Sequence, residues 1–213
     1  INTSHVEYSD NDRVTSSTDS NGNTTQYTYD ALDRCVLVTE ADGAHTSLVW
    51  SPRSNLLSSE DANGTTVTNS YDLNDRIVHR DITARGGAAA TTTFEAYAYD
   101  GLSRCVAATN DVSSTTFAYD SLGNCVQSTQ DGLTTTKTYD GKGNCLSMTY
   151  PGGRVVTYSD DACDQPISLS SAAGGGLPST VLAQYAYEGP GRLGGITRAN
   201  NVNTRIQWNG LSN

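Results

Sequence analysis

The sequence predicts an all-β protein built from tandem repeats, and three observations lead to that fold class. An aromatic residue recurs about every 20 residues along the 213-residue chain. The residue two positions before it is often apolar as well, which is the side-chain period of a β-strand. Gly, Asn, Asp and Ser gather between these segments, as hairpin turns require. No substantial helix is expected.

The recurring aromatic residues, here called anchors, set the repeats. Successive anchors are 21, 21, 21, 28, 20, 20, 19, 29 and 21 residues apart. Such self-similarity indicates units that bury their apolar faces only against neighbouring units. We therefore expect residues 1–213 to form one continuous array of about nine to ten repeats. The anchors are Tyr8, Tyr29, Trp50, Tyr71, Tyr99, Tyr119, Tyr139, Tyr158, Tyr187 and Trp208.

Each repeat is expected to contain two strands and two turns. The first strand ends at the anchor, and its aromatic residues are predicted to form stacked rows on one face of a sheet. The aspartate that follows half of the anchors, such as Asp30 or Asp100, is expected to bond backbone amides as an Asx-turn. A second strand follows, for instance at 34–39. It ends at a second group of turns, predicted at 19–23, 40–43, 61–64, 131–132 and 151–153.

Two repeats are longer than the others, which predicts longer loops at about 82–94 and 170–182. Insertions on a repeat scaffold are a common place for binding functions. The simpler alternative is a Gly/Ala-rich loop without a ligand.

The charge of the chain excludes several classes of partner. A net charge of −10 argues against binding to nucleic acid and to anionic membrane surfaces, which require clustered Lys and Arg. No apolar run approaches the roughly 18 residues of a membrane-spanning helix. We expect neither a nucleic-acid partner nor a membrane span.

Four of the five cysteines are in register with the repeat. Cys35, Cys105, Cys125 and Cys145 each lie six residues after an anchor, where other repeats carry an aliphatic residue. Packing is therefore their expected role. Equivalent positions in successive repeats would be roughly 9.6 Å apart, beyond the roughly 7 Å limit for a disulfide. Cys163 is out of register by one position.

The sequence predicts no catalytic, cofactor-binding or metal-binding residues. The acidic residues stand mostly at turn positions, and His5, His45 and His79 share no register. Hydrolase, zinc-protease and nucleotide-binding motifs are absent. The loop at 19–23 has a partial likeness to a calcium loop without EF-hand spacing, so calcium at the turns stays an open alternative. Asn2, Asn23 and Asn63 fit the N-glycosylation acceptor pattern, which makes glycans a further alternative.

The phrases that begin at the anchors carry a resemblance to a known family. Residues 29–35, 71–77, 99–105, 119–125 and 139–145 follow the pattern Tyr-Asp-x-x-(Gly/Asp/Ser)-(Arg/Asn)-(Cys/Ile). This pattern resembles the YD repeat of the RHS family, which includes bacterial polymorphic toxins, shells of insecticidal toxin complexes and teneurins. The resemblance implies β-hairpins in a curved or spiralling single sheet that serves as a scaffold.

These observations favour a non-enzymatic, extracellular structural scaffold, secreted or at the cell surface. Its roughly 18 expected strands would span about 86 Å and close into a ring about 27 Å across, whereas a 100-residue guest needs roughly 35 Å. The chain breaks off in mid-repeat after Trp208 and is expected to be a piece of a larger shell or of an open-ended fibre. The predicted partners are copies of the chain joined head-to-tail through open sheet edges, or a cargo enclosed by the full-length protein. The alternative is an adhesion module that binds carbohydrate or a cell-surface partner.

Overall fold

The computed structural model describes residues 4–85, 92–172, 179–189 and 191–208. The described secondary structure is almost entirely β-strand, as the sequence predicts. Contacts between Cα atoms divide the chain into two compact units, residues 1–114 and 115–213. The central parts of the two longer loops, 86–91 and 173–178, lie outside the described residues.

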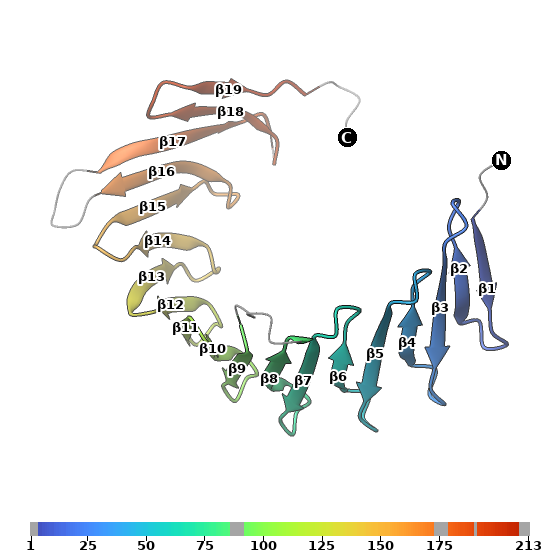
Figure 1. The fold of residues 1–213 in the computed structure, drawn as a ribbon. Coiled ribbons are helices and arrows are strands. Elements are labelled where there is room, and N and C mark those ends of the chain that lie inside the picture. The colour runs from blue at the N-terminus through green and yellow to red at the C-terminus, as the bar shows by residue number, and fades with distance from the viewer. Residues whose placement is uncertain (1–3, 86–91, 173–178, 190, 209–213) are drawn as a thin grey trace. The chain divides into compact units, whose positions relative to one another are not determined.

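The first unit is an antiparallel sheet in which each strand pairs with the next in the chain (Figure 1). Its strands are β1 (His5–Tyr8), β2 (Val14–Thr18), β3 (Thr24–Tyr29), β4 (Cys35–Thr39), β5 (His45–Trp50), β6 (Leu56–Glu60), β7 (Thr66–Tyr71), β8 (Ile77–Thr83), β9 (Phe94–Tyr99) and β10 (Cys105–Asn110).

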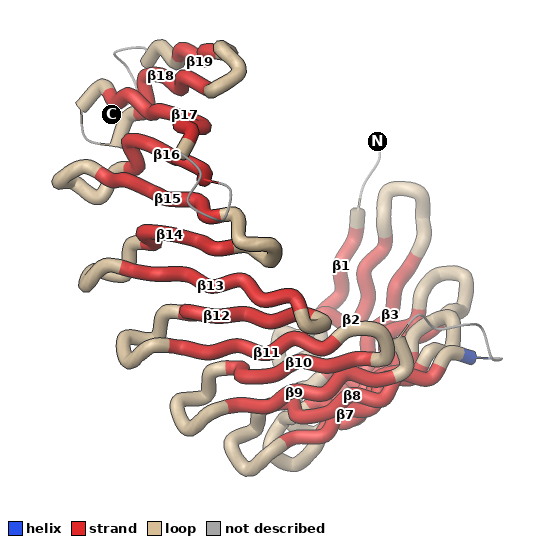
Figure 2. Tube along the Cα trace, turned by 90° about the vertical axis from the view of Figure 1, so that its left-hand side faces the viewer, coloured by secondary structure: helices blue, strands red, loops and turns tan. Residues whose placement is uncertain are grey.

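The second unit repeats this arrangement with nine strands. They are β11 (Ser114–Tyr119), β12 (Cys125–Gln130), β13 (Leu133–Tyr139), β14 (Cys145–Thr149), β15 (Val155–Asp160), β16 (Pro166–Ala172), β17 (Thr180–Tyr187), β18 (Leu193–Arg198) and β19 (Asn203–Arg205). In both units the connections lie alternately at the two ends of the strands (Figure 2). The predicted turns at 19–23, 40–43, 61–64, 131–132 and 151–153 are confirmed.

A β-bulge recurs where the first strand of a repeat reaches its anchor. In the β3–β4 hairpin Thr28 lies opposite Leu37 and Tyr29 lies opposite Cys35, so the second strand has one extra residue. Pairing of β4 with the next repeat begins only at Leu37. The Cys35 carbonyl is therefore outside the pairing with the next strand. The same shift occurs at Tyr8, Trp50, Tyr71, Tyr119, Tyr139 and Tyr187.

The turn that follows an anchor commonly has a left-handed residue in its fourth position, whereas after Tyr158 the left-handed residue is Asp164, in a turn that begins at Asp161. Asp33 and Ser103 adopt φ angles of 57° and 64°, and glycine occupies the same place in other repeats, with 92° at Gly123. The left-handed conformation is strained for residues with a Cβ atom, while Asn and Asp tolerate it better than most. This requirement explains why Gly, Asp and Ser alternate at one position of the repeated phrase.

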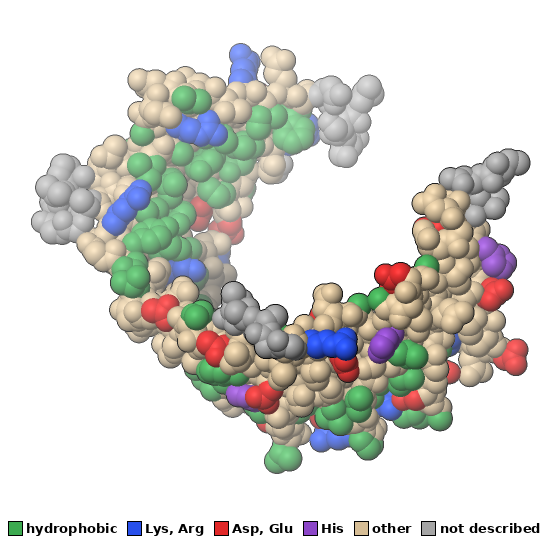
Figure 3. Space-filling model, in the orientation of Figure 1, with side chains coloured by type: hydrophobic (Ala, Val, Ile, Leu, Met, Phe, Trp, Pro, Cys, Tyr) green, Lys and Arg blue, Asp and Glu red, His purple; other side chains and the backbone are tan. Residues whose placement is uncertain are grey.

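The interior of the protein is thin. Among the described apolar residues only Val156 and Ala183 are buried, at 5% and 8% exposed, and most strand residues are half-buried. Hydrophobic side chains gather over β13 to β17 in the second unit (Figure 3). A single sheet has no second layer to cover it, so backbone and side-chain hydrogen bonds must supply much of the order.

The left-handed turn position gives a test of the fold. We expect Gly123→Ala to lower the free energy of unfolding by about 1 kcal/mol, because a Cβ atom strains the backbone at a φ of 92°. Steric contact does not contribute, since no other atom lies within 4 Å of the added Cβ. Gly141→Ala is the matched control, since Gly141 has equally open surroundings without a positive φ. Urea denaturation of both variants measures the difference. Equal effects would contradict the assignment of the strain to the backbone.

Candidate functional site: the contact between successive repeats

The polar atom of six of the anchors joins a repeat to the one before it. The Tyr29 hydroxyl donates a hydrogen bond to the Val14 carbonyl at 2.8 Å, and the Trp50 indole nitrogen donates to the Cys35 carbonyl at 2.8 Å. The acceptor in each case is the residue six positions after the preceding anchor, at the bulge. The same bond joins Tyr71 to Leu56, Tyr99 to Ile77, Tyr139 to Cys125 and Trp208 to Leu193, at 2.8 to 3.1 Å.

This bond explains why the anchors are Tyr or Trp. Both have a wide aromatic body and a hydrogen-bond donor at its far end, which Phe lacks. Burial raises the pKa of Tyr139, so its hydroxyl stays protonated and can donate. The sequence predicted stacked aromatic rows, but the contact of these six anchors with the neighbouring repeat is a hydrogen bond to a carbonyl. Exposure also varies, since Tyr8 is 62% exposed.

The aspartate after the anchor organises the turn, as predicted. The Asp30 Oδ1 atom accepts hydrogen bonds from the backbone amides of Leu32 and Arg34, at 2.9 and 3.0 Å. Its Oδ2 atom accepts from Arg34 Nε at 2.7 Å. The bond from the Arg34 side chain is the main cause of a lowered pKa at Asp30. Asp72 and Asp100 pair in the same way with Arg76 and Arg104.

The residue five positions after the anchor connects adjacent turns. The Arg34 guanidinium donates to the Ser51 carbonyl of the next repeat at 2.6 Å and lies 5.9 Å from the centre of the Trp50 ring. Asn55 reaches Asp75 in the next turn at 2.7 Å, so Arg and Asn make equivalent bridges. Arg76 reaches the turn at Ser103, and Asn144 reaches Asp164.

Four of the five cysteines share one position of the repeat, as their register predicts, and that position lies at the bulge. Cys35, Cys105, Cys125 and Cys145 are half-buried free thiols, and Cys163 is exposed. The Cys35 thiol points to the Leu37 carbonyl of its own strand at 3.6 Å, and the other three make the same contact at 3.3 to 3.5 Å. A thiol thus fits the bulge as a small apolar group with a weak donor.

The polar groups of the calcium-like turn at 19–23, which include the predicted glycosylation residue Asn23, bond to one another. Asp19 accepts from the amides of Asn21 and Asn23 and from the Asn23 side chain at 2.8 Å, so its carboxylate serves the turn. Asn63 is an exposed turn residue, and Asn2 lies outside the described residues. Within the described part of the chain no three His, Cys, Asp or Glu side chains group closely enough to hold a metal ion.

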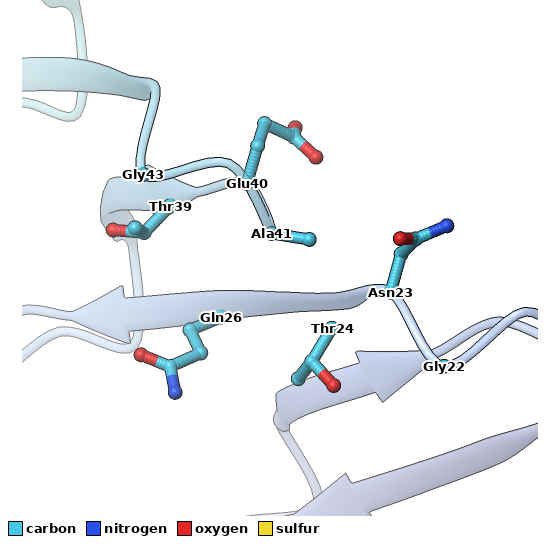
Figure 4. A pocket seen from close by; sticks show the side chains of 8 residues that line it. All are labelled: Gly22, Asn23, Thr24, Gln26, Thr39, Glu40, Ala41 and Gly43. Carbon is cyan, nitrogen blue, oxygen red and sulfur yellow. The ribbon is translucent and has the colours of Figure 1, made fainter.

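A polar groove of about 440 Å³ lies between the turns 19–23 and 40–43 of the first unit. Figure 4 shows the Asn23 and Glu40 side chains extending from its two sides. Glu40 is the only acidic or basic residue in its lining and accepts a hydrogen bond from Thr25 at 3.0 Å. The groove therefore has no acid and base pair.

The described residues thus define an array of β-hairpins in which aromatic donors join most of the repeats to their predecessors. Residues 8–45 and 119–155 match the family model of the RHS repeat. These two segments are RHS repeats, which confirms the resemblance predicted from the Tyr-Asp phrases. A search of curated proteins gave no match.

Solved structures of toxin components share the fold. The crystal structure of TcdB2-TccC3-Cdc42 is 15% identical, with a TM-score of 0.82 over 97% of this chain and 12% of that chain. TcdB2-TccC3 without its hypervariable C-terminal region gives the same values. The Tc holotoxin pore of Photorhabdus luminescens is 14% identical, with a TM-score of 0.61 over 93% of this chain and 13% of that chain. The chain thus spans about an eighth of the length of these structures.

The anchor hydrogen bond can be tested by removing one oxygen. We expect Tyr29→Phe to lower the free energy of unfolding by about 1 kcal/mol, because the Val14 carbonyl loses its donor. Tyr71→Phe is expected to cost less, since the Leu56 carbonyl also accepts from Asn69 Nδ2 at 2.9 Å. Urea denaturation measures both. A neutral effect of Tyr29→Phe would contradict the role given to this bond.

The turn aspartates predict an acid-sensitive stability. The pKa of Asp72 lies below its ordinary value of 3.8, chiefly because of the bond from the Arg76 side chain. A lowered folded-state pKa gives stability that is present above about pH 4 and lost as pH falls through the folded-state value. We expect Asp72→Asn to lower Tm at about pH 7, with a difference from the wild type that shrinks as pH falls below about 4. A Tm difference that does not change with pH would refute this.

Proposed function

We propose that the chain is one stretch of a non-enzymatic structural wall belonging to a larger, secreted, hollow protein shell. The observation that carries the proposal is the overlay of 97% of this chain on 12% of a TcdB2-TccC3 chain. A strip of this geometry therefore occurs as a small part of a much larger toxin component. The RHS resemblance implies a shell-forming scaffold, and the two matched RHS segments support that reading.

The contacts along the chain suit a wall. The bonds between repeats are made by turn and anchor residues, with partners such as Tyr29 with Val14 and Arg34 with Ser51. These groups hold strands side by side and point to no common reacting centre. None of the described segments forms a helix with the length and apolarity of a membrane span.

The partners follow from the same role. A wall of the full-length protein would enclose a cargo, whereas an open-ended fibre would join copies of the chain through the edges of its sheets. An unpaired sheet edge readily pairs with another strand. The shell is favoured here because the structures that share the fold contain this strip within one longer chain.

Electron microscopy of the native full-length assembly tests this function. We expect bounded hollow particles, because a wall of hairpins must close to enclose a cargo. Continuous fibres with a regular axial rise would refute the shell and support a filament. Compact particles without an internal space would refute both structural roles.

A second candidate function is adhesion to carbohydrate or to a cell-surface partner. The interruptions of the repeat at 82–94 and 170–182 favour it, because insertions on repeat scaffolds commonly carry binding. Deletion of 84–90 or of 172–178 tests these loops, with loss of binding on a glycan array as the expected result. Glycosylation at Asn2, Asn23 and Asn63 is part of the secreted role that we propose, and mass spectrometry of the native protein tests it.

A further inference from the structure

Polar residues replace apolar ones on the aromatic face of the sheet across β7, β8 and β9. Asn69 stands two positions before the anchor Tyr71, where other repeats carry Tyr27, Leu48 or Phe117. Arg80 of β8 lies directly opposite Asn69, and Glu95 of β9 lies directly opposite Arg80. Directly opposed residues of neighbouring antiparallel strands share one face. Asn69, Arg80 and Glu95 therefore form a polar row across three strands.

Two members of the polar row are reachable from solvent and bonded to each other. Arg80 Nη1 lies 3.0 Å from Glu95 Oε2, and the Tyr97 hydroxyl donates to the same oxygen at 2.8 Å. The Tyr97 bond is the main cause of a lowered pKa at Glu95, which keeps it a carboxylate. The Arg80 and Glu95 side chains are 38% and 30% exposed. The described residues provide no hydrogen-bond partner for Glu95 Oε1.

The third member is buried and incompletely bonded. Asn69 is 8% exposed, and its Nδ2 atom donates to the Leu56 carbonyl at 2.9 Å. Its Oδ1 atom is buried without a hydrogen-bond partner in the described structure. A buried acceptor without a donor destabilises the fold, and leucine at this position would avoid the cost. Such a local conflict is expected where a binding function requires it.

We propose that the polar row is a binding site for a neutral sugar residue of a glycan, which gives the adhesion function a defined place. The opposite charges of Arg80 and Glu95 cancel, which favours a neutral ligand over an ionic one. Glu95 Oε1 can accept from a sugar hydroxyl, and the remaining Arg80 N–H groups can donate to sugar oxygens. The half-buried ring of Tyr97, bonded to Glu95, provides apolar surface for a sugar face.

Asn69 acts in this site through Arg80 as a positioning residue. When a sugar hydroxyl takes over contacts to Glu95, the Arg80 guanidinium can turn to Asn69 Oδ1 on the opposing strand. The buried oxygen then gains its donor only in the bound state. A contact made in one state alone shifts the equilibrium toward that state.

The test is binding of the full chain to an array of neutral oligosaccharides, with sialylated and sulfated glycans as charged comparators. We expect binding to neutral glycans that is weakened about tenfold or more by Asn69→Leu and by Glu95→Val. These changes install the residues that Leu48 and Val67 hold at the same positions of other repeats. Glu60→Gln, on the exposed Glu60 of β6, is the control and is expected to bind like the wild type.

A second readout separates binding from folding. Asn69→Leu is expected to have a Tm at least as high as the wild type, because it removes the unbonded oxygen while Tyr71 still donates to the Leu56 carbonyl. Weaker binding in a protein of undiminished stability is a combination that a purely structural role would not produce. If neutral glycans do not bind, or if Asn69→Leu binds them like the wild type, the site is refuted. Neither result affects the shell, which microscopy tests separately.

Discussion

The hydrogen bond that six of the anchors make to the carbonyl at the preceding bulge is the interaction on which the rest of the array depends. The bulge ends the regular pairing with the next strand and leaves a carbonyl such as that of Cys35 without a strand partner. The Trp50 indole of the next repeat supplies the donor. An unbonded buried backbone group would be costly, so bulge and anchor are stable only together. The repeat length is fixed by this pairing of two distant positions.

Around this bond the other residues of the repeated phrase have separate tasks. Asp30 closes the turn, Asp33 takes the left-handed conformation, and Arg34 reaches the next turn. Because the sheet buries few side chains fully, these polar contacts replace part of what a second layer of structure would contribute. The repeated phrase therefore contains the residues that close each turn and join it to the next hairpin.

Much of this architecture could be predicted from the sequence, because local chemistry determines it. The strands were predicted from the spacing of the anchors, and the Asx-turns were predicted from residues such as Asp30. The partner of Tyr29 could not be predicted, because a one-residue bulge leaves no mark in the alternation of apolar residues. The polar row was also missed, since Asn69, Arg80 and Glu95 become neighbours only when the register of three successive strands is known.

The chain of contacts from one hairpin to the next also determines how the protein would respond to a pulling force. The side chains of Tyr29, Trp50 and Tyr71 donate hydrogen bonds to the carbonyls of Val14, Cys35 and Leu56, respectively. Each bond joins a repeat to the one before it. Tension applied along the chain would therefore release one hairpin at a time. Each released hairpin would lengthen the molecule by about 20 residues of extended chain, or roughly 70 Å. An array of this kind would extend stepwise under load instead of unfolding in a single event.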